Sequence, residues 1–350
     1  MNWLPGQSRT AGAAAGSMVA LGLLVCGCVF AAMAGPALSQ HTQSVALHQT
    51  MAGLSATTKT VQVSGAWSDF TDQLNTNGTV TNNGAAQRNL SPGELTSATR
   101  ELGHGFAALP LPLGPGAWAG LTTNLLDAAG VGPRAQAGGT PKLEVTYRDP
   151  FTSYTRVVAG SYASTAAPAG TLAVAATTQI AARFGLHPGS LVTVTSGGVA
   201  VHLFVTAILT EREPGSTFWA QDLIASTPEL DGDTSPQPYW VGGVFADPDQ
   251  LGPMQNAFNG PDMELNWEFP LSVGGVNANQ AQGLENALNR AVTVTPTLTG
   301  TLATGENTLT VSSPLIANLA TFLATQAAVQ TVLLLLFVSL VVVEIGRAHV

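Results

Sequence analysis

The sequence predicts an α+β extracytoplasmic domain of mixed, largely antiparallel strands, flanked by transmembrane α-helices. Three observations lead to this fold class. Long apolar segments stand at both ends of the chain, residues 171–210 carry strand, helix and hairpin patterns in turn, and capping sequences mark helix starts between the ends. Such a succession is typical of helices packed on an antiparallel sheet.

The C-terminal apolar segment predicts a membrane span. No residue between Asn307 and Val343 is charged, and 319–343 exceeds the roughly 20 apolar residues that a helix needs to cross a bilayer. Its second half is apolar on every helical face, whereas a helix on a soluble core keeps a polar stripe. Residues 344–350 follow abruptly, and we interpret them as a non-native or truncated tail, with a short genuine cytoplasmic tail as the alternative.

The N-terminal apolar segment, 18–38, has two interpretations. It is either a transmembrane helix, with Arg9 favouring a cytoplasmic N-terminus, or a secretion signal. A small-x-small sequence ending at Ala34 offers a cleavage site for the second reading. Cys28 offers only a poor lipid-attachment site, because another cysteine stands two residues before it.

The predicted order along the chain follows from these two segments. It consists of a cytoplasmic N-terminus (1–17), a first transmembrane helix (18–38), an extracytoplasmic core domain (39–315), a second transmembrane helix (319–343) and the tail (344–350). Both cysteines, Cys26 and Cys28, lie in the first apolar segment, so the middle region has no thiol, which is compatible with an oxidising exterior. The net charge of −9 argues against nucleic acid, which needs clustered Lys and Arg.

Helix starts in the middle region are marked by capping sequences. In each, a short polar residue stands three positions before Glu or Gln. The pairs are Ser91 with Glu94, Asp247 with Gln250, and Asn277 with Gln280. We expect the three helices to run to about 109, 258 and 292. Residues 41–60 are predicted to continue the first span as a helix.

Residues 171–210 carry the clearest strand pattern. A strand at 172–175 precedes a short helix at 177–184, and Gly185 closes that helix. Strands at 191–195 and 199–209 then form a hairpin around Gly197-Gly198. Alternation predicts further strands at 61–67, 142–147, 239–245 and 263–273, and residues 75–89 read as a solvated loop.

Motifs of catalytic and metal sites are missing from the sequence. It has no G-x-x-x-x-G-K-[ST] loop, so the chain is not its own ATPase, and no G-x-S-x-G motif. The histidines lack paired-ligand spacing; they are His41, His48, His104, His187, His202 and His349. Asp231 and Asp233 are interpreted as solvated, although folding could still assemble an acid pair. We therefore predict no enzyme, no catalytic, cofactor-binding or metal residue, and no cofactor.

A family resemblance lies within residues 171–222. Residues 181–194 (AARFGLHPGSLVTV), between a strand and a glycine hairpin, resemble the periplasmic core domain of FtsX-like and MacB-like ABC transporter permeases. There, small residues, Leu-Gly-Leu, one residue and Gly-Asp precede a strand; here Ser190 stands where Asp is commoner. Residues 209–222 (LTEREPGSTFWAQD) resemble the turn that contains Pro and Trp in long-chain permeases of this group. The layout of the whole chain is also similar.

The resemblance implies the N-terminal portion of a multi-pass cell-membrane permease subunit. Such a subunit belongs to an ABC transporter or an ABC-type mechanotransmission complex and couples a separate cytoplasmic ATPase to its extracytoplasmic domain. It would form a dimer of permease subunits, contact membrane lipid and carry at least two more spans. The alternative is a secreted or lipid-anchored binding or adhesion protein with a C-terminal membrane anchor. The mature N-terminus distinguishes the two.

Overall fold

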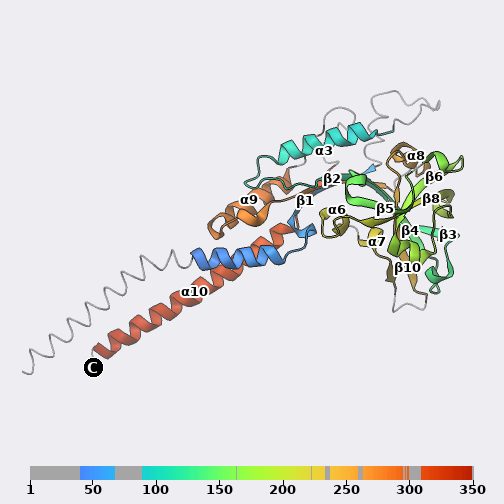
Figure 1. Ribbon diagram of the computed structural model, residues 1–350. Helices are drawn as coiled ribbons and strands as arrows, with labels where there is room; N and C mark the ends of the chain where they lie inside the picture. The colour runs from blue at the N-terminus through green and yellow to red at the C-terminus, as the bar shows by residue number, and fades with distance from the viewer. Residues whose placement is uncertain are drawn as a thin grey trace, which may run out of the picture. The chain divides into compact units, whose positions relative to one another are not determined.

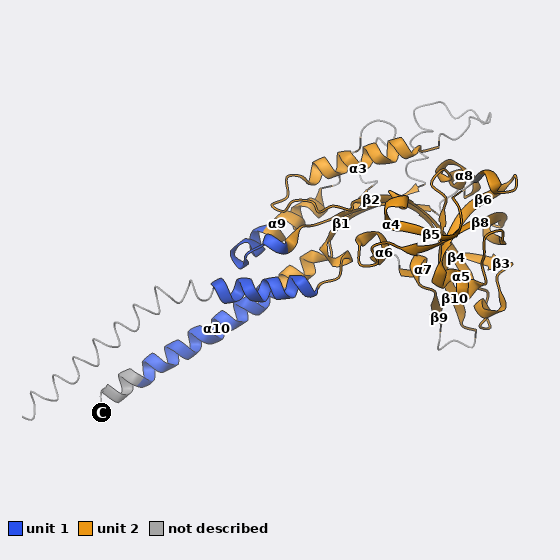
Figure 2. Ribbon diagram, in the orientation of Figure 1, with its two compact units in different colours: residues 1–53, 274–283, 321–350 blue, residues 54–273, 284–320 orange. Residues whose placement is uncertain are grey.

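A computed structural model describes residues 40–67, 89–162, 164–221, 223–232, 237–258, 263–294, 296, 298 and 309–348 (Figure 1). These residues divide into two compact units (Figure 2). The described residues of unit 1 come from 40–53, 274–283 and 321–348, and those of unit 2 from 54–273 and 284–320. The predicted first span, most of the predicted loop at 75–89, and Asp233 lie outside the described residues.

Six strands of unit 2 form a closed barrel. They are β3 (Leu126–Ala129), β4 (Lys142–Asp149), β6 (Thr171–Thr177), β7 (Leu191–Ser196), β8 (Val199–Glu211) and β10 (Tyr239–Ala246). Pairing runs from β4 through β3, β7, β8, β6 and β10, and β10 pairs back with β4, which closes the ring. Outside the ring, β5 (Thr155–Gly160) pairs with β8 and β9 (Glu229–Asp231) pairs with β10. Closure leaves the six strands fewer exposed edges.

Four further strands extend from the barrel, and we call them the extension sheet. In spatial order they are β2 (Trp118–Thr123), β11 (Met263–Pro270), β1 (Thr60–Ala66) and β12 (Thr310–Ser312), with β2 paired to β4. Only β4–β10 and β6–β8 are parallel among the described pairings. The predicted α+β class with a mixed, largely antiparallel sheet is therefore confirmed.

The extension sheet has one apolar and one largely polar face, because side chains alternate along its strands. Helix α3 (Pro92–Phe106) packs on the apolar face, where the Phe106 and Phe269 ring centroids lie 5.3 Å apart. Leu95 and Leu102 of α3 are also buried. The opposite face carries Gln62, Ser64, Glu264, Asn266 and Glu268. Those residues form the candidate site below.

Two of the three predicted helix starts agree with the structure. The Ser91 side chain accepts from the Glu94 amide while Glu94 reaches back to the Ser91 amide, and α3 then ends at Phe106. Helix α9 (Ala278–Thr293) begins where Gln280 accepts from the Asn277 amide.

The predicted helix start at Asp247 is wrong. Helix α8 spans Leu251–Ala257 and its N-cap is Gln250. Asp247 directly follows β10, is fully buried and accepts a hydrogen bond from Thr206, so its side chain is not available to cap a helix. Tertiary burial has here overridden a local capping signal.

The block that carries the family resemblance folds as predicted. Helix α5 (Thr178–Phe184) is capped by the Thr177 hydroxyl, which accepts from the Ile180 amide, and ends at Gly185 with φ 69°. Gly197 and Gly198 have φ 54° and 81°, as a two-residue hairpin turn between β7 and β8 requires.

Several elements were not predicted or differ in extent. The strands β2, β3, β5, β9 and β12 had no sequence signal in the patterns above, and β11 ends at Pro270. Short helices connect the strands: α4 (Phe151–Tyr154), α6 (Thr217–Ala220), α7 (Leu223–Ser226), and 3-10 turns at Thr57–Lys59, Pro133–Ala135, Ser164–Ala166 and Val273–Gly275.

Unit 1 contains the helix at 40–53 and residues from α9 and α10. The His48 Nε2 atom lies 2.9 Å from the Val276 carbonyl oxygen, and the Ala278 amide donates to the Ser44 hydroxyl. The expected helix over 41–60 ends at 53, and a 3-10 turn at Thr57–Lys59 precedes β1.

Helix α10 (Leu315–Ala348) is the one helix of the described chain that is long and apolar enough to cross a membrane. The qualifying stretch is Leu315–Val343, with a mean hydropathy of 2.3, and it includes the predicted span 319–343. Its large apolar side chains from Val329 to Val343, except Val341, are exposed. A continuous exposed apolar surface of this length fits a lipid environment better than water.

Candidate functional site

A polar cavity of about 250 Å³ lies against the polar face of the extension sheet. It is lined by Gln62, Val63, Ser64, Trp118, Gln221, Glu264, Asn266, Trp267, Glu268 and Ser312. The four strands of the extension sheet supply all of these except Gln221, which directly follows α6. We call it the sheet cavity. Its rim residues Gln221, Glu264 and Ser312 are exposed, whereas Glu268 is buried.

Strand register places the central residues of the sheet cavity in one row. Glu268 of β11 is opposite Gln62 of β1 on one side and opposite Trp118 of β2 on the other. Gln62 is in turn opposite Ser312 of β12. Directly opposed side chains lie about 5 Å apart at Cβ and share a face of the sheet. A row across four strands therefore converges on the same cavity.

Two amides connect the row to the segment after α6. Gln62 Nε2 donates to Gln221 Oε1 at 2.9 Å, and the Ser312 hydroxyl donates to Gln62 Oε1 at 3.4 Å. Residues that are distant in sequence thus meet on one side of the cavity.

Glu268 is the buried charge of the sheet cavity. The residue is 1% exposed, and both of its carboxylate oxygens are buried. Burial raises the pKa of Glu268 to about 7, while Thr60, the Arg148 charge, Gln62 and Trp118 oppose part of the rise. The carboxyl group can therefore gain or lose a proton near neutral pH.

Arg148 of β4 is opposite Gly120 of β2, and its guanidinium lies among aromatic rings. Its guanidinium carbon is 4.6 Å from the ring centroid of Trp118 and 5.5 Å from that of Phe218, and its Nη1 donates to the Phe218 carbonyl. The charge is thus held by cation–π contacts and a backbone acceptor in an apolar cluster. Arg148 is not among the cavity-lining residues.

Gly120 provides the space in which Trp118 and Arg148 stack. A Cβ atom at this position would lie 2.6 Å from the Tyr147 carbonyl oxygen, 3.2 Å from the Trp118 ring and 3.3 Å from Arg148 Cγ. The first of these distances is impossible without moving backbone. The junction between β2 and β4 therefore requires glycine here.

A second, larger cavity of about 740 Å³ lies at another part of unit 2. Lys59, Glu213 and Tyr154 are its ionisable lining residues. Burial, with a smaller effect from the Glu213 charge, raises the pKa of Tyr154. Its lining mixes apolar and polar groups, and these ionisable side chains form no convergent hydrogen-bond network in the described contacts.

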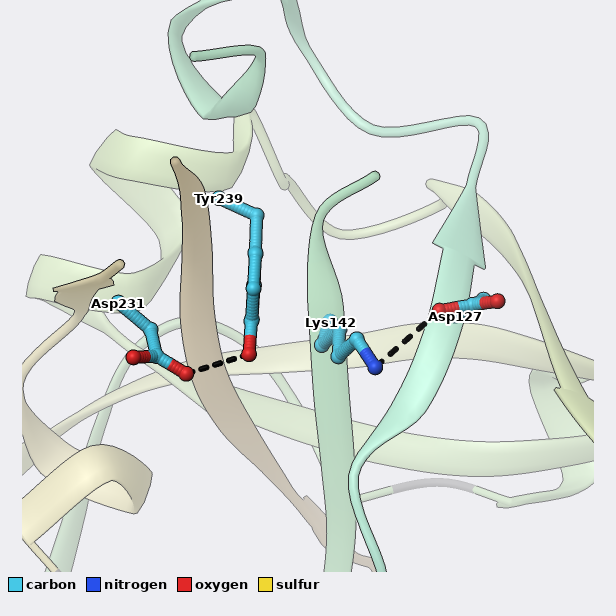
Figure 3. A network of polar contacts seen from close by, with 4 residues as sticks. All are labelled: Asp127, Lys142, Asp231 and Tyr239. Atoms are coloured by element: carbon cyan, nitrogen blue, oxygen red, sulfur yellow. Dashed lines mark hydrogen bonds and ion pairs between the residues drawn. The ribbon is translucent and has the colours of Figure 1, made fainter. Parts of the chain in front are cut away.

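The barrel surface carries an exposed polar network across four strands (Figure 3). Lys142 of β4 lies 3.7 Å from an Asp127 carboxylate oxygen of β3, and Tyr239 of β10 donates to Asp231 of β9. The Lys142 ammonium is also 5.3 Å from the Tyr239 ring centroid. Exposed pairs of this kind contribute little stability and hold no enclosed space, so we do not treat the network as a binding site.

The histidines that the structure describes are dispersed. His48 contacts a carbonyl, His104 lies on exposed α3 surface, and His202 pairs with the Thr193 hydroxyl at 3.1 Å. Within the described residues, no group of three His, Cys, Asp or Glu side chains could hold a metal ion.

Sequence patterns single out none of the sheet-cavity residues. The available signal is the alternation M-E-L-N-W-E-F at 263–269, which places Glu264, Asn266 and Glu268 on one face.

Comparison with known proteins found similar solved structures only. No family model and no curated protein matches this chain. The periplasmic region of MacB from Actinobacillus actinomycetemcomitans is 10% identical with a TM-score of 0.31, over 74% of this chain and 90% of that one. A domain of a putative permease protein from Porphyromonas gingivalis is 11% identical with a TM-score of 0.29, over 74% and 91%.

Proposed function

We propose that this chain is part of an FtsX-like or MacB-like ABC permease subunit, with a large extracytoplasmic domain carried by membrane helices. A separate cytoplasmic ATPase would drive the helices, and the subunit would act as a dimer. The sequence block 171–222 supports this proposal, because the residues that resemble the family form the consecutive elements β6, α5, β7 and β8.

The observation that carries the proposal is the place where the chain enters and leaves the extension sheet. Strand β1 begins at Thr60 and its neighbour β12 ends at Ser312. The Ser313 hydroxyl donates to the Thr60 carbonyl at 2.7 Å, so the two connections leave from neighbouring strand ends. This is the arrangement that a domain inserted between two membrane helices needs.

The connection to α10 is short and anchored. Only Ser313 and Pro314 separate β12 from α10, and Leu315 and Leu319 in the first turns of the helix are fully buried. A displacement of the helix would therefore be passed to an edge strand rather than absorbed by a flexible linker. We assign the domain a mechanical role in coupling, and no catalytic step.

Labelling of single cysteines tests the location of the domain. In a background with Cys26 and Cys28 replaced by serine, Ala200→Cys places a thiol on the exposed end of β8. A membrane-impermeant maleimide should label it in intact cells, whereas Ser8→Cys in the predicted cytoplasmic segment should react only after lysis. Labelling of Ala200→Cys only after lysis would refute the proposal. Absence of residue 8 from the mature chain would favour the anchored binding protein.

The gene sequence beyond this segment tests the proposed partnership with a separate ATPase. We expect further membrane spans beyond 343 and an adjoining ABC ATPase, which should co-purify with the full-length protein after co-expression. A stop codon directly after this segment, with no ATPase gene nearby, would contradict the permease assignment even if the domain proved to be extracytoplasmic.

A further inference from the structure

The larger cavity, of about 740 Å³, has two walls that come from different parts of unit 2. The sheet wall consists of Lys59, just before β1, and residues 270–273 at the end of β11. The barrel wall consists of Tyr154, at the end of α4, and residues 213–217 after β8. Sites for small molecules usually measure about 300 to 1,000 Å³, so the cavity has the size of a ligand site.

The loop 114–116 connects the two walls. On the sheet side, the Gly114 amide donates to the Pro270 carbonyl at 2.7 Å. On the barrel side, the Thr217 hydroxyl donates to the Gly116 carbonyl at 3.4 Å. The walls are therefore held beside each other by hydrogen bonds of the fold, and the cavity between them does not need a ligand to form.

The Tyr154 hydroxyl is positioned at the cavity by its neighbours. Its ring stacks on Phe218, with ring centroids 4.7 Å apart and 14° between the ring planes. A Cβ atom at Gly116 would lie 2.7 Å from the hydroxyl oxygen, so glycine leaves room for it, and the φ of 90° there also favours glycine. Burial raises the pKa of Tyr154, so the hydroxyl stays protonated and can donate a hydrogen bond.

The two walls carry charges of opposite sign. Lys59 lies on the sheet wall and Glu213 on the barrel wall, and neither has an ion-pair partner among the described residues. By contrast, Lys142, the other lysine of the chain, lies 3.7 Å from Asp127. A ligand with a single charge would be attracted by one wall and repelled by the other. A ligand with both charges can pair with each wall.

We propose that the larger cavity binds a small zwitterion, with its ammonium group beside Glu213 and its anionic group beside Lys59. The apolar lining residues are Leu54, Pro115, Pro270, Leu271 and Val273. A short peptide with apolar side chains fits this lining, and the Tyr154 hydroxyl can donate to one of its carbonyl oxygens. Phosphoethanolamine, a headgroup of membrane lipids, has the same two charges without the apolar side chains. The site goes beyond the proposed mechanical role and does not depend on it.

Calorimetric titration of the full chain in uncharged maltoside micelles tests the charge pattern, with empty micelles as the blank. Leucyl-leucine has both charges, N-acetyl-leucyl-leucine lacks the ammonium group, and leucyl-leucinamide lacks the carboxylate. At pH 7 we expect leucyl-leucine to bind saturably and each analogue to bind at least about fivefold more weakly. No saturable binding of leucyl-leucine or of glycerophosphoethanolamine, or equal affinity for the singly charged analogues, would overturn the proposal. Tighter binding of glycerophosphoethanolamine than of leucyl-leucine would support the zwitterion and identify a lipid headgroup, rather than a peptide, as its source.

Matched variants connect each charge of the cavity to one end of the ligand. Glu213→Gln should lower the affinity for leucyl-leucine at least about fivefold and abolish the penalty of N-acetylation. Lys59→Met should lower it similarly and abolish the penalty of amidation instead. Lys142→Met and Glu229→Gln, on the barrel surface, are the controls and should leave the affinity unchanged. Thermal unfolding shows whether each variant is folded. Folded Glu213→Gln and Lys59→Met chains that keep the wild-type affinity and both penalties would refute the assignment.

Discussion

Asp247, beside the barrel, and Glu268, in the extension sheet, are the two most deeply buried carboxylates of the described chain, and their surroundings differ. Asp247, beside the barrel, is 0% exposed and the Thr206 hydroxyl lies 2.8 and 3.0 Å from its two oxygens. Glu268, in the extension sheet, is 1% exposed, and the side chains of Thr60, Gln62 and Trp118 and the Arg148 charge favour its ionised form. Burial raises the pKa of Asp247 to about 6 and that of Glu268 to about 7.

The difference follows from how each region is enclosed. Strand closure brings Thr206 of β8 beside the residue that follows β10, so the fold itself supplies a partner for Asp247. The extension sheet is open, with α3 covering one face and the sheet cavity on the other. A partnered buried carboxylate belongs to the packing of the fold. A buried carboxylate whose pKa is raised to about 7 is instead a group that can exchange a proton near neutral pH.

The largest effect is expected at the junction of the two regions. Gly120→Val should destabilise the protein by about 3 kcal/mol or more, because its side chain would overlap the Tyr147 carbonyl and the stacked Trp118. Urea unfolding of the full chain in detergent micelles measures this. Gly105→Ala on exposed α3, where a Cβ meets nothing within 4 Å, is the control and should stabilise slightly. Similar stabilities for the two variants would show that the junction is loose.

Glu268→Gln should stabilise the protein at neutral pH. The folded pKa of about 7 lies above the ordinary value of 4.5, so the unfolded chain ionises first as pH rises. Wild-type stability is therefore lost between pH 4.5 and pH 7, by up to about 3 kcal/mol, and is constant above. The variant removes this loss, so its advantage should vanish near pH 4. An advantage that is the same at pH 4 and pH 8 would contradict the burial argument.

The elements that sequence predicts well are those with local causes. The capping box at Ser91, the αL residue Gly185 and the turn at Gly197-Gly198 depend on neighbours within a few positions, and all three form as expected. Strand β2 could not be found in the same way. Its sequence WAGLTT is buried at nearly every position, so the alternation that marks a half-exposed strand is missing.

Neither the barrel nor the candidate site could be predicted from the sequence, because both depend on pairing between strands that are distant in the chain. The parallel pairing of β4 with β10 closes the ring of barrel strands, and no local sequence pattern predicts this pairing. The same holds for the burial of Glu268. Alternation at 263–269 places its side chain on the polar face, but the side chains that favour its ionised form, Thr60, Gln62 and Trp118, come from two other strands. Local sequence patterns therefore do not single out Glu268, whose surroundings form only when distant strands pair.

A smaller effect is expected in the barrel hairpin. Gly198 has φ 81° and a Cβ there would meet nothing within 4 Å, so Gly198→Val acts through backbone strain alone. We expect a loss of about 1–2 kcal/mol in urea unfolding. Val199→Thr, at the exposed first residue of β8, is the control and should change stability little. A neutral Gly198→Val variant would mean that the turn adopts another conformation.

The smallest effect tests how far α3 supports the extension sheet. Ser91→Ala removes the hydroxyl that accepts from the Glu94 amide, and should cost about 1 kcal/mol. Ser97→Ala makes the same exchange at an exposed position inside α3, where the higher helix propensity of alanine should give a small gain. Because α3 covers only the apolar face, neither variant should alter the pH dependence of stability that Glu268 causes on the polar face. If Ser91→Ala changed that pH dependence, the surroundings of Glu268 would depend on the packing of the opposite face, and the separation between the two faces would fail.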